Sequence, residues 1–227
     1  MSVPILLSWS GGKDCLLALE TLRRDPRWRV VGFLTSITRD FDRVAMHGIR
    51  RDVLHAQARL LGVPLIEMEL DWPGSNEAYE RSLAHTLAHA RQRWPDLRHV
   101  AYGDLKLEDV RAFRVSTLAR YGWHAKFPLW GEDTAAIAQR FVRDGHRANL
   151  VCVDSHQLEP CFCGREFNAT LLHDLPPAVD PCGENGEFHT ICHDGPLFAT
   201  PLRLRRGESV LRDARFQYMD YLLDAGD

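Results

Sequence analysis

A glycine-containing loop near the start of the chain constrains its fold more than any other feature of the sequence. The apolar run Val3–Ser8 is followed by Trp9-Ser10-Gly11-Gly12-Lys13-Asp14-Cys15, and apolar residues then recur at helical spacing. A strand, a glycine turn and a helix in this order direct backbone N–H groups and the positive end of the helix dipole toward one point. The sequence therefore predicts a phosphate-binding cradle at the end of a buried strand.

The side chains of this loop suit the same interpretation. Gly11 and Gly12 allow a phosphate to approach the backbone closely, Lys13 adds a positive charge, and Ser10 adds a hydroxyl. Asp14 could carry or orient Mg²⁺, so we expect it to be the metal ligand. The loop is not a Walker A motif, because Leu7 stands where that motif has its first glycine. An ordinary Gly-Gly turn is the alternative interpretation.

Beyond the loop, predicted strands and helices alternate along the chain. Such alternation is typical of βαβ units, and it predicts an α/β fold with a doubly wound parallel sheet. We expect further strands at 29–36, 64–70, 99–103, 124–127 and 149–153, and helices at 47–61, 76–93, 107–121 and 133–144.

The pattern changes after Asp154, where prolines and cysteines become frequent. We expect a helix at 165–174 and a hairpin of two strands at 187–192 and 197–205; the segment 216–223 is either a strand or a short helix. The sequence thus predicts two domains, a nucleotide-binding domain at 1–154 and a small C-terminal α+β domain at 155–227.

Composition narrows the class of protein. The chain has 227 residues, 45% hydrophobic and 26% charged, which is typical of a folded globular protein. The net charge of -3 does not favour a nucleic acid as partner. No apolar run could cross a bilayer and the first residues lack the basic region of a signal peptide, so we expect a cytoplasmic protein with no membrane partner.

Six cysteines are present, and in a cytoplasmic protein we expect them to be reduced. Four of them and nearby histidines could be drawn as a zinc site, although they lack the paired short spacings of structural zinc modules. These four are Cys161, Cys163, Cys182 and Cys192.

The string Ser10-Gly11-Gly12-Lys13-Asp14 resembles the PP-loop of the N-type ATP pyrophosphatases, with Cys15 in place of the usual serine. This resemblance implies a fold of the HUP type and cleavage of ATP between its α and β phosphates. A thiol donates hydrogen bonds poorly, so the resemblance does not assign Cys15 a firm contact to pyrophosphate.

Further strings resemble the diphthine–ammonia ligase family across nearly the whole chain. They are Met46-His47, Leu61-Gly62-Val63-Pro64, Tyr102-Gly103-Asp104, Phe127-Pro128-Leu129-Trp130 and Cys182-Gly183-Glu184-Asn185-Gly186-Glu187-Phe188-His189-Thr190. The family uses ATP and ammonium to convert diphthine to diphthamide, releasing AMP and pyrophosphate. The resemblance implies an amide ligase that adenylates a carboxylate acceptor, either a small molecule or a protein, and a homodimer is one possible assembly.

The resemblance also implies site residues. The expected catalytic residues are Lys13, Asp14, Glu184, Asn185, Glu187 and His189. The residues expected to bind ATP are Ser10, Gly11, Gly12, Lys13, Asp14, Cys15, Ser36, His47, Gly103 and Asp104, with Mg²⁺ on Asp14. From spacing alone, a polar turn that leads into a hairpin is the favoured interpretation of the segment around Glu187, and the resemblance reverses this order.

Two alternatives remain at this point. One is a PP-loop enzyme that modifies tRNA in the manner of a thiolase, with sulfur carried by Cys161, Cys163 or Cys182. The other is a nucleotide-binding module without catalysis, which the departure at Cys15 favours. For the ligase, we expect Lys13→Ala to abolish ATP binding and to leave the fold intact.

Overall fold

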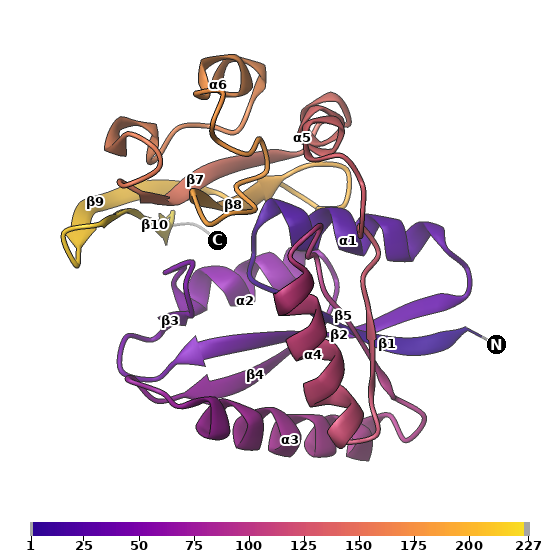
Figure 1. The fold of residues 1–227 in the computed structure, drawn as a ribbon. Coiled ribbons are helices and arrows are strands. Elements are labelled where there is room, and N and C mark those ends of the chain that lie inside the picture. The colour runs from indigo at the N-terminus through magenta and orange to yellow at the C-terminus, as the bar shows by residue number, and fades with distance from the viewer. Residues whose placement is uncertain (1, 225–227) are drawn as a thin grey trace.

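The computed structural model describes residues 2–224, which form two sheets joined through a layer of helices (Figure 1). The first sheet and its helices follow the predicted alternation. The elements are β1 (Val3–Ser8), α1 (Lys13–Arg24), β2 (Trp28–Thr38), β3 (Arg43–Val44), α2 (Arg51–Leu60), β4 (Leu65–Leu70), α3 (Asn76–Arg93), β5 (His99–Ala101), α4 (Glu108–Arg120) and β6 (His124–Lys126).

Strand β1 lies at the centre of the first sheet, between β2 and β5, and pairs with both in parallel. Strand β4 pairs with β2 in parallel and β6 pairs with β5 in parallel, whereas the short β3 runs antiparallel to β2. The chain therefore builds outward from β1 on one side and then crosses to the other side. Ligands of such sheets bind at this crossing point, beyond the carboxyl ends of the strands. The predicted doubly wound parallel sheet is confirmed.

The second sheet is antiparallel, with the order β8-β7-β10-β9. Its elements and the helices around it are α5 (Thr134–Arg143), β7 (Arg147–Asp154), a 3-10 helix (Pro160–Phe162), α6 (Ala169–Asp174), β8 (Phe188–Asp194), β9 (Leu204–Arg212) and β10 (Phe216–Leu223). The expectation that 149–153 continues the parallel alternation is wrong, because β7 pairs with β8 and β10. The domain boundary after residue 154 stays a prediction.

The predicted hairpin between 187–192 and 197–205 is also wrong. Strand β9 pairs with β10, and the segment between β8 and β9 is a loop that contains Pro196 and Pro201, which cannot donate hydrogen bonds to a neighbouring strand. The actual hairpin turns at Asp213 and Ala214, both with positive φ, as a two-residue turn between twisted strands requires. The segment 216–223, for which the sequence allowed either a strand or a short helix, is the strand β10.

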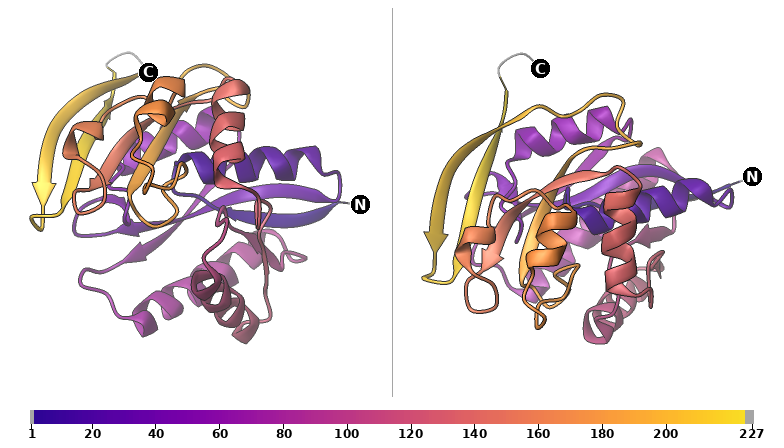
Figure 2. Two further views of the ribbon diagram at one scale, coloured as in Figure 1. Left: turned by 45° about the horizontal axis from the view of Figure 1, so that its top comes forward. Right: turned by 90° about the horizontal axis from the view of Figure 1, so that it is seen from above.

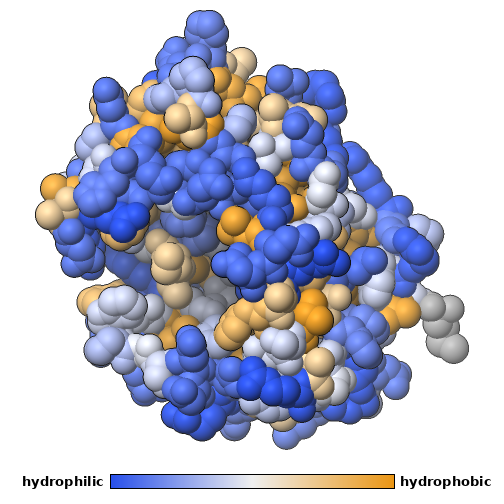
Figure 3. Space-filling view, viewed as in Figure 1, coloured by the Kyte–Doolittle hydropathy of each residue, from blue (hydrophilic) through white to orange (hydrophobic). Residues whose placement is uncertain are grey.

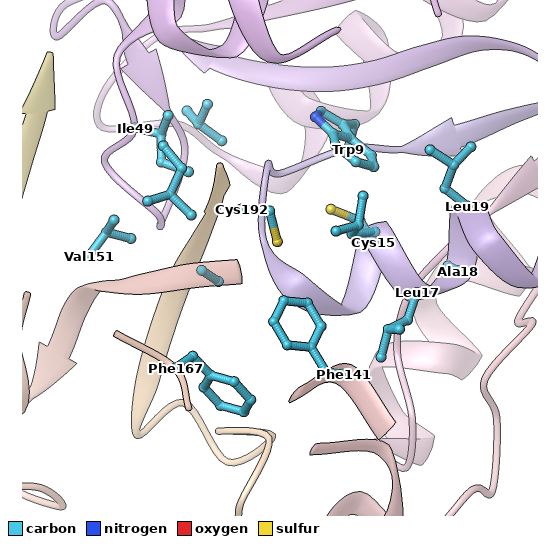
Figure 4. Packing of buried hydrophobic residues seen from close by; sticks show 14 of the residues in the cluster. Trp9, Cys15, Leu17, Ala18, Leu19, Ile49, Phe141, Val151, Phe167 and Cys192 are labelled. Atoms are coloured by element: carbon cyan, nitrogen blue, oxygen red, sulfur yellow. The ribbon is translucent and has the colours of Figure 1, made fainter. Parts of the chain in front are cut away.

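Helix α1 lies between the two sheets, and for this reason most of its residues are buried, including Lys13 and Glu20. Helices α1 and α2 cover one face of the parallel sheet, α3 and α4 cover the other, and the C-terminal sheet packs over α1 and α2 (Figures 1 and 2). Figure 4 shows side chains from α1, α5 and β8 in one continuous core, among them Leu17, Phe141 and Cys192. Across residues 2–224, every helix is too short or too polar to span a membrane.

Candidate functional site

The predicted phosphate loop joins β1 to α1 and is held from the C-terminal side. Gly11 has a φ of +86°, which a glycine adopts without strain, and Gly12 caps α1. The Gly11 carbonyl accepts hydrogen bonds from the Cys192 backbone N–H and from Gln57 Nε2, both at 2.9 Å. A Cβ on Gly12 would lie 3.2 Å from the Thr190 carbonyl oxygen. Strand β8 therefore forms one wall of the loop.

Lys13 points toward the C-terminal segment, where it is 1% exposed. Its ammonium donates to both oxygens of Asp14, at 2.8 and 2.9 Å, and to the carbonyl of Cys182. Its backbone N–H donates to Thr190 Oγ1 at 3.0 Å. Burial alone would lower the pKa of Lys13, but Asp14, with smaller effects from Cys182 and Glu184, outweighs burial and the pKa is raised. Lys13 is therefore a charged link between the two halves of the chain as well as a candidate phosphate ligand.

The Asp14 side chain keeps 29% of its surface exposed, so it remains accessible for a metal ion. Burial of the carboxyl group raises its pKa, against the opposing effect of the Lys13 charge. Mg²⁺ is usually held by one or two carboxylates together with substrate phosphates and water, and Asp14 fits that role. Within residues 2–224, no three His, Cys, Asp or Glu side chains cluster as a structural zinc site built from protein ligands would require, so the zinc interpretation finds no support.

The Cys15 thiol is turned into the first turn of α1. It donates to the Gly12 carbonyl at 3.0 Å, and Ser10 Oγ lies 3.7 Å from the sulfur. Burial raises the pKa of Cys15 to about 11, so the thiol stays neutral at physiological pH. At this position, therefore, sulfur packs against the core while the neighbouring Ser10 remains partly exposed.

Gly103 follows β5 and lies against the phosphate loop. A Cβ there would be 2.8 Å from the Asp14 carbonyl carbon, a separation that no real Cβ tolerates, so only glycine fits. Asp104 forms an ion pair with Arg114, with 2.7 Å between Oδ2 and Nε. Ser36 lies in β2, beside the central strand, and its carbonyl accepts from the Ala45 N–H. Gly103 and Ser36, both predicted to bind ATP, therefore lie in or just after the strands that flank β1, whereas Asp104 is already paired with Arg114.

Two histidines that are far apart in sequence meet beside the loop. The ring centroids of His47 and His189 are 4.4 Å apart, and a Cβ on Gly12 would lie 3.4 Å from His47 Nε2. Burial lowers the pKa of His189 to about 4, and the charge of Lys13 lowers it further. Burial and the proximity of His189 hold the pKa of His47 well below its usual range. Both imidazoles are therefore neutral at physiological pH, and their lowered pKa values make them weak bases.

The segment Glu184–His189 is folded around Glu187. The Glu187 carboxylate is buried and accepts from the Asp180 N–H, the Asn185 N–H and the Asn185 side-chain amide, at 2.8 to 2.9 Å. These bonds close a loop over residues 180–187. Glu187 and Asn185 are both predicted to be catalytic. In the structure the Glu187 oxygens accept from the backbone of this loop, and the Asn185 side chain donates to Glu187.

Glu184 faces the segment between β5 and α4, where its Oε2 accepts from the Leu105 N–H at 3.1 Å. Burial raises the pKa of Glu184 to about 7, and the nearby Asp14 and Asp104 carboxylates add to the rise, although Lys13 opposes it. Carboxyl groups with such pKa values suit proton transfer near neutral pH. Glu184, Lys13 and Asp14 thus form one electrostatic group built from both ends of the chain.

Sequence reasoning missed two buried polar residues that complete the site. Gln57 in α2 donates through Nε2 to the Gly11 carbonyl in the phosphate loop and to the Cys192 carbonyl in β8. Asp180 accepts from Lys106 Nζ at 2.5 Å, from Thr134 Oγ1 at 3.1 Å and from the Cys182 N–H at 2.8 Å. A signal for Gln57 existed: it lies among Val53, Leu54 and Ala58 on the apolar side of its helix, where a polar residue needs a partner.

Three arginines outside the loop, Arg50, Arg111 and Arg165, have ordinary structural partners. Arg50 forms an ion pair with Asp220 in β10, with 2.6 Å between Nη2 and Oδ2. The guanidinium of Arg111 stacks 4.5 Å from the Trp130 ring, and Arg165 pairs with Asp174. A cavity of about 510 Å³ between β4 and α3 is lined by none of the predicted site residues. By contrast, Figure 3 shows a hollow on the face where the parallel strands end.

Comparisons with known proteins identify the family of the chain. A family model described as the diphthamide synthase N-terminal domain matches residues 3–121, and one described as the diphthamide synthase C-terminal domain matches residues 133–219. A diphthine–ammonia ligase of Schizosaccharomyces pombe is 24% identical over 185 residues, covering 75% of this chain and 30% of the relative. One from Danio rerio is 26% identical over 174 residues, covering 68% of this chain and 66% of the relative. The chain thus spans less than two thirds of the length of either relative.

Proposed function

The chain belongs to the diphthamide synthase family, and from this premise we propose that it is an ATP-dependent amide ligase that forms AMP and pyrophosphate. The observation that carries the proposal is the convergence of the phosphate loop with the Glu184–His189 segment. Lys13 bonds to the Cys182 carbonyl and Glu184 bonds to the Leu105 N–H, so the two segments share one site. A ligase needs both a nucleotide cradle and proton-transferring groups within reach of it.

In this proposal the pyrophosphate part of ATP lies on the N-terminal end of α1, where the Gly12 N–H and the helix dipole attract negative charge. Asp14 would hold Mg²⁺ together with the phosphates, and the ion would supply charge neutralisation as pyrophosphate leaves. The adenosine would extend along the strand ends past Ser36 and His47. The loop, Asp14 and Gly103 therefore orient the α-phosphorus toward the C-terminal segment.

The reaction has two steps. An oxygen of the acceptor carboxylate attacks the α-phosphorus, its bond to the bridging oxygen breaks, and pyrophosphate leaves. Ammonia then attacks the acyl carbon of the adenylate, and AMP departs with the electron pair of the broken C–O bond. Ammonium must first lose a proton, and the Glu184 carboxylate, whose pKa is raised to about 7, is the group placed to accept it, while the neutral His47 and His189 rings lie beside the loop.

The mouth of the site supports an acceptor carried on a protein. The most exposed large apolar side chains of residues 2–224 are Met46 at 71%, Trp72 at 65%, Leu211 at 53% and Phe41 at 47%. The rings of Phe41 and Trp72 are 6.4 Å apart, and the Arg212 guanidinium lies 5.8 Å from Phe41. Met46 directly precedes His47. Apolar side chains grouped beside a site are typical of protein docking surfaces.

The charges around this rim do not suit a nucleic acid. Arg39 is already paired with Glu69 and Asp71, at 3.2 and 3.1 Å, and further carboxylates stand nearby at Asp40 and Asp213. Two of the three cysteines of the thiolase alternative are poorly suited to carry sulfur, because burial raises the pKa of Cys182 and of Cys163 to about 12, and the Cys182 thiol donates to the Thr134 carbonyl. We therefore propose a cytoplasmic ligase whose acceptor is a carboxylate on a protein.

The test is to incubate the protein with ATP, ammonium and cell extract, and to measure AMP, ADP and pyrophosphate. We expect AMP and pyrophosphate in equal amounts, dependent on extract, with the stimulating activity retained above an ultrafiltration membrane. Mass spectrometry of that fraction before and after reaction would identify the amidated group. ADP as the product, or AMP release that needs no ammonium, would contradict the proposed ligase.

A further inference from the structure

Gln57 in α2 is a buried residue with a complete set of hydrogen bonds to the nucleotide loop and its wall. It is 1% exposed. Its Nε2 donates to the Gly11 carbonyl at 2.9 Å and to the Cys192 carbonyl at 2.7 Å. Its Oε1 accepts from Trp9 Nε1 at 2.8 Å, and this bond fixes which end of the amide faces the loop. Trp9 is itself held by stacking on Phe33, with 4.0 Å between ring centroids.

The bond to Gly11 determines the direction of the next N–H. Within residues 2–224 the one cis peptide bond joins Trp72 to Pro73, so the peptide between Gly11 and Gly12 is trans. In a planar trans peptide the carbonyl and the following N–H point in opposite directions. Because Gln57 Nε2 and the Cys192 N–H both hold the Gly11 carbonyl toward α2 and β8, the Gly12 N–H points the other way, out of the wall.

Within the protein, this N–H makes only a long contact of 3.4 Å to Ser10 Oγ. Gly11 has a positive φ, so the peptide unit sits between two glycines and could flip at little cost if nothing held it. A flip would turn the carbonyl oxygen toward the place where a phosphate is expected. The loop therefore needs an external group to keep its donor directed at the ligand.

We propose that Gln57 is the positioning residue of the phosphate cradle: it fixes the Gly11–Gly12 peptide so that the Gly12 N–H is presented to the β and γ phosphates of ATP. This proposal rests on the proposed function, since it assumes that the loop binds ATP. It assigns α2 a role in the site, although Gln57 itself touches no nucleotide. It also explains why a polar side chain occupies the apolar face of that helix.

The test compares Gln57→Leu with the wild-type protein by calorimetric titration of ATP and of AMP. We expect ATP affinity to fall about 10-fold, because a charge-assisted bond to phosphate loses its orientation, while AMP affinity changes less than about 2-fold. AMP lacks the β and γ phosphates, so the ratio of the two affinities isolates the cradle. A purely structural role would lower both affinities together or lower neither.

A matched control is Thr86→Val, which removes one buried hydrogen bond to the Ser82 carbonyl on the opposite face of the sheet. Its ATP affinity should equal that of the wild type even if it melts earlier. Should Gln57→Leu fail to fold, Gln57→Glu replaces it. An ionised carboxylate there repels the two carbonyls, whereas protonation restores a donor, so its ATP affinity should recover toward wild type as pH falls from about 8 to about 5.5.

The outcomes separate the two proposals. Wild-type protein that binds no ATP overturns the proposed function and this inference together. Wild-type protein that binds ATP, with a folded Gln57→Leu variant of unchanged ATP affinity, overturns the inference alone. A Gln57→Glu variant whose affinity shows no pH-dependent recovery beyond that of the wild type has the same consequence.

Discussion

Replacing Lys13 with methionine tests whether this residue is a structural link as well as a phosphate ligand. Methionine keeps most of the apolar stem of lysine, so the change removes the charge with little change in packed volume. It leaves the Asp14 carboxylate and the Cys182 carbonyl without the partner that now satisfies both. The sequence alone predicts that the fold survives such a change, whereas the structure predicts a measurable loss of stability.

The magnitude follows from the burial of the pair. Removing one partner of a buried ion pair costs about 3–5 kcal/mol, because the other charge is left uncompensated. Asp14 is 29% exposed, so water recovers part of this cost and we expect the lower end, about 3 kcal/mol. For a chain of this size, that corresponds to a fall in melting temperature of roughly 6–12 °C.

The assay is thermal denaturation followed by circular dichroism, with ATP titration on the same preparation. Lys126→Met is the matched control, since the Lys126 side chain is exposed and its ammonium lies 5.8 Å from the Trp28 ring. We expect the control to stay within about 0.5 kcal/mol of wild type. If Lys13→Met melts with the wild type and loses only ATP binding, Lys13 is not a link and the reasoning from its burial is wrong.

Three further predictions concern the two segments of the site. In the wild type, the rate should rise near pH 7, where Glu184 with its raised pKa becomes ionised, and Glu184→Gln should remove this rise. The wild type should also lose stability between about pH 4.5 and 7, because the unfolded chain releases this proton there and the folded protein does not; the Glu184→Gln variant should lack this loss. Cys15→Ser should keep or raise turnover in the AMP assay, because a hydroxyl can make the same bond to the Gly12 carbonyl; a collapse of turnover would mean that the thiol has its own role. Glu187→Gln should lower the melting temperature, because an amide N–H₂ would face the N–H donors of Asp180 and Asn185. Because the same loop carries Glu184, AMP formation should also fall, by about 100-fold, with ATP affinity near wild type; unchanged AMP release would remove this segment from the active site.

Local signals were sufficient for much of the first sheet. The helix predicted at 76–93 has the observed bounds, and the strand predicted at 64–70 begins one residue later. Hydrophobic periodicity and turn residues depend on a few neighbouring positions, so helices and strands that they determine can be predicted from the sequence alone. The phosphate loop belongs to the same class, because a strand, two glycines and a helix N-terminus are consecutive in the chain.

The pairing of the C-terminal strands was decided by tertiary structure. The turn at Asp213 and Ala214 carries no Asn-Gly or Asp-Gly signal, whereas Asp194-Gly195-Pro196 does resemble a turn, so local reasoning paired the wrong strands. Strand β7 likewise joins the second sheet because its partners, β8 and β10, lie downstream and offer antiparallel edges.

What the sequence determined by itself is therefore the α/β class, the glycine loop between β1 and α1, and the family resemblance. The roles of individual side chains were decided only in three dimensions. Lys13 meets Cys182, Gln57 meets Cys192, and His47 meets His189, across separations of more than 130 residues. Whether a polar group is free for a ligand depends on whether a buried partner already satisfies it, and such partners come from segments that only the packing of two sheets around α1 brings together.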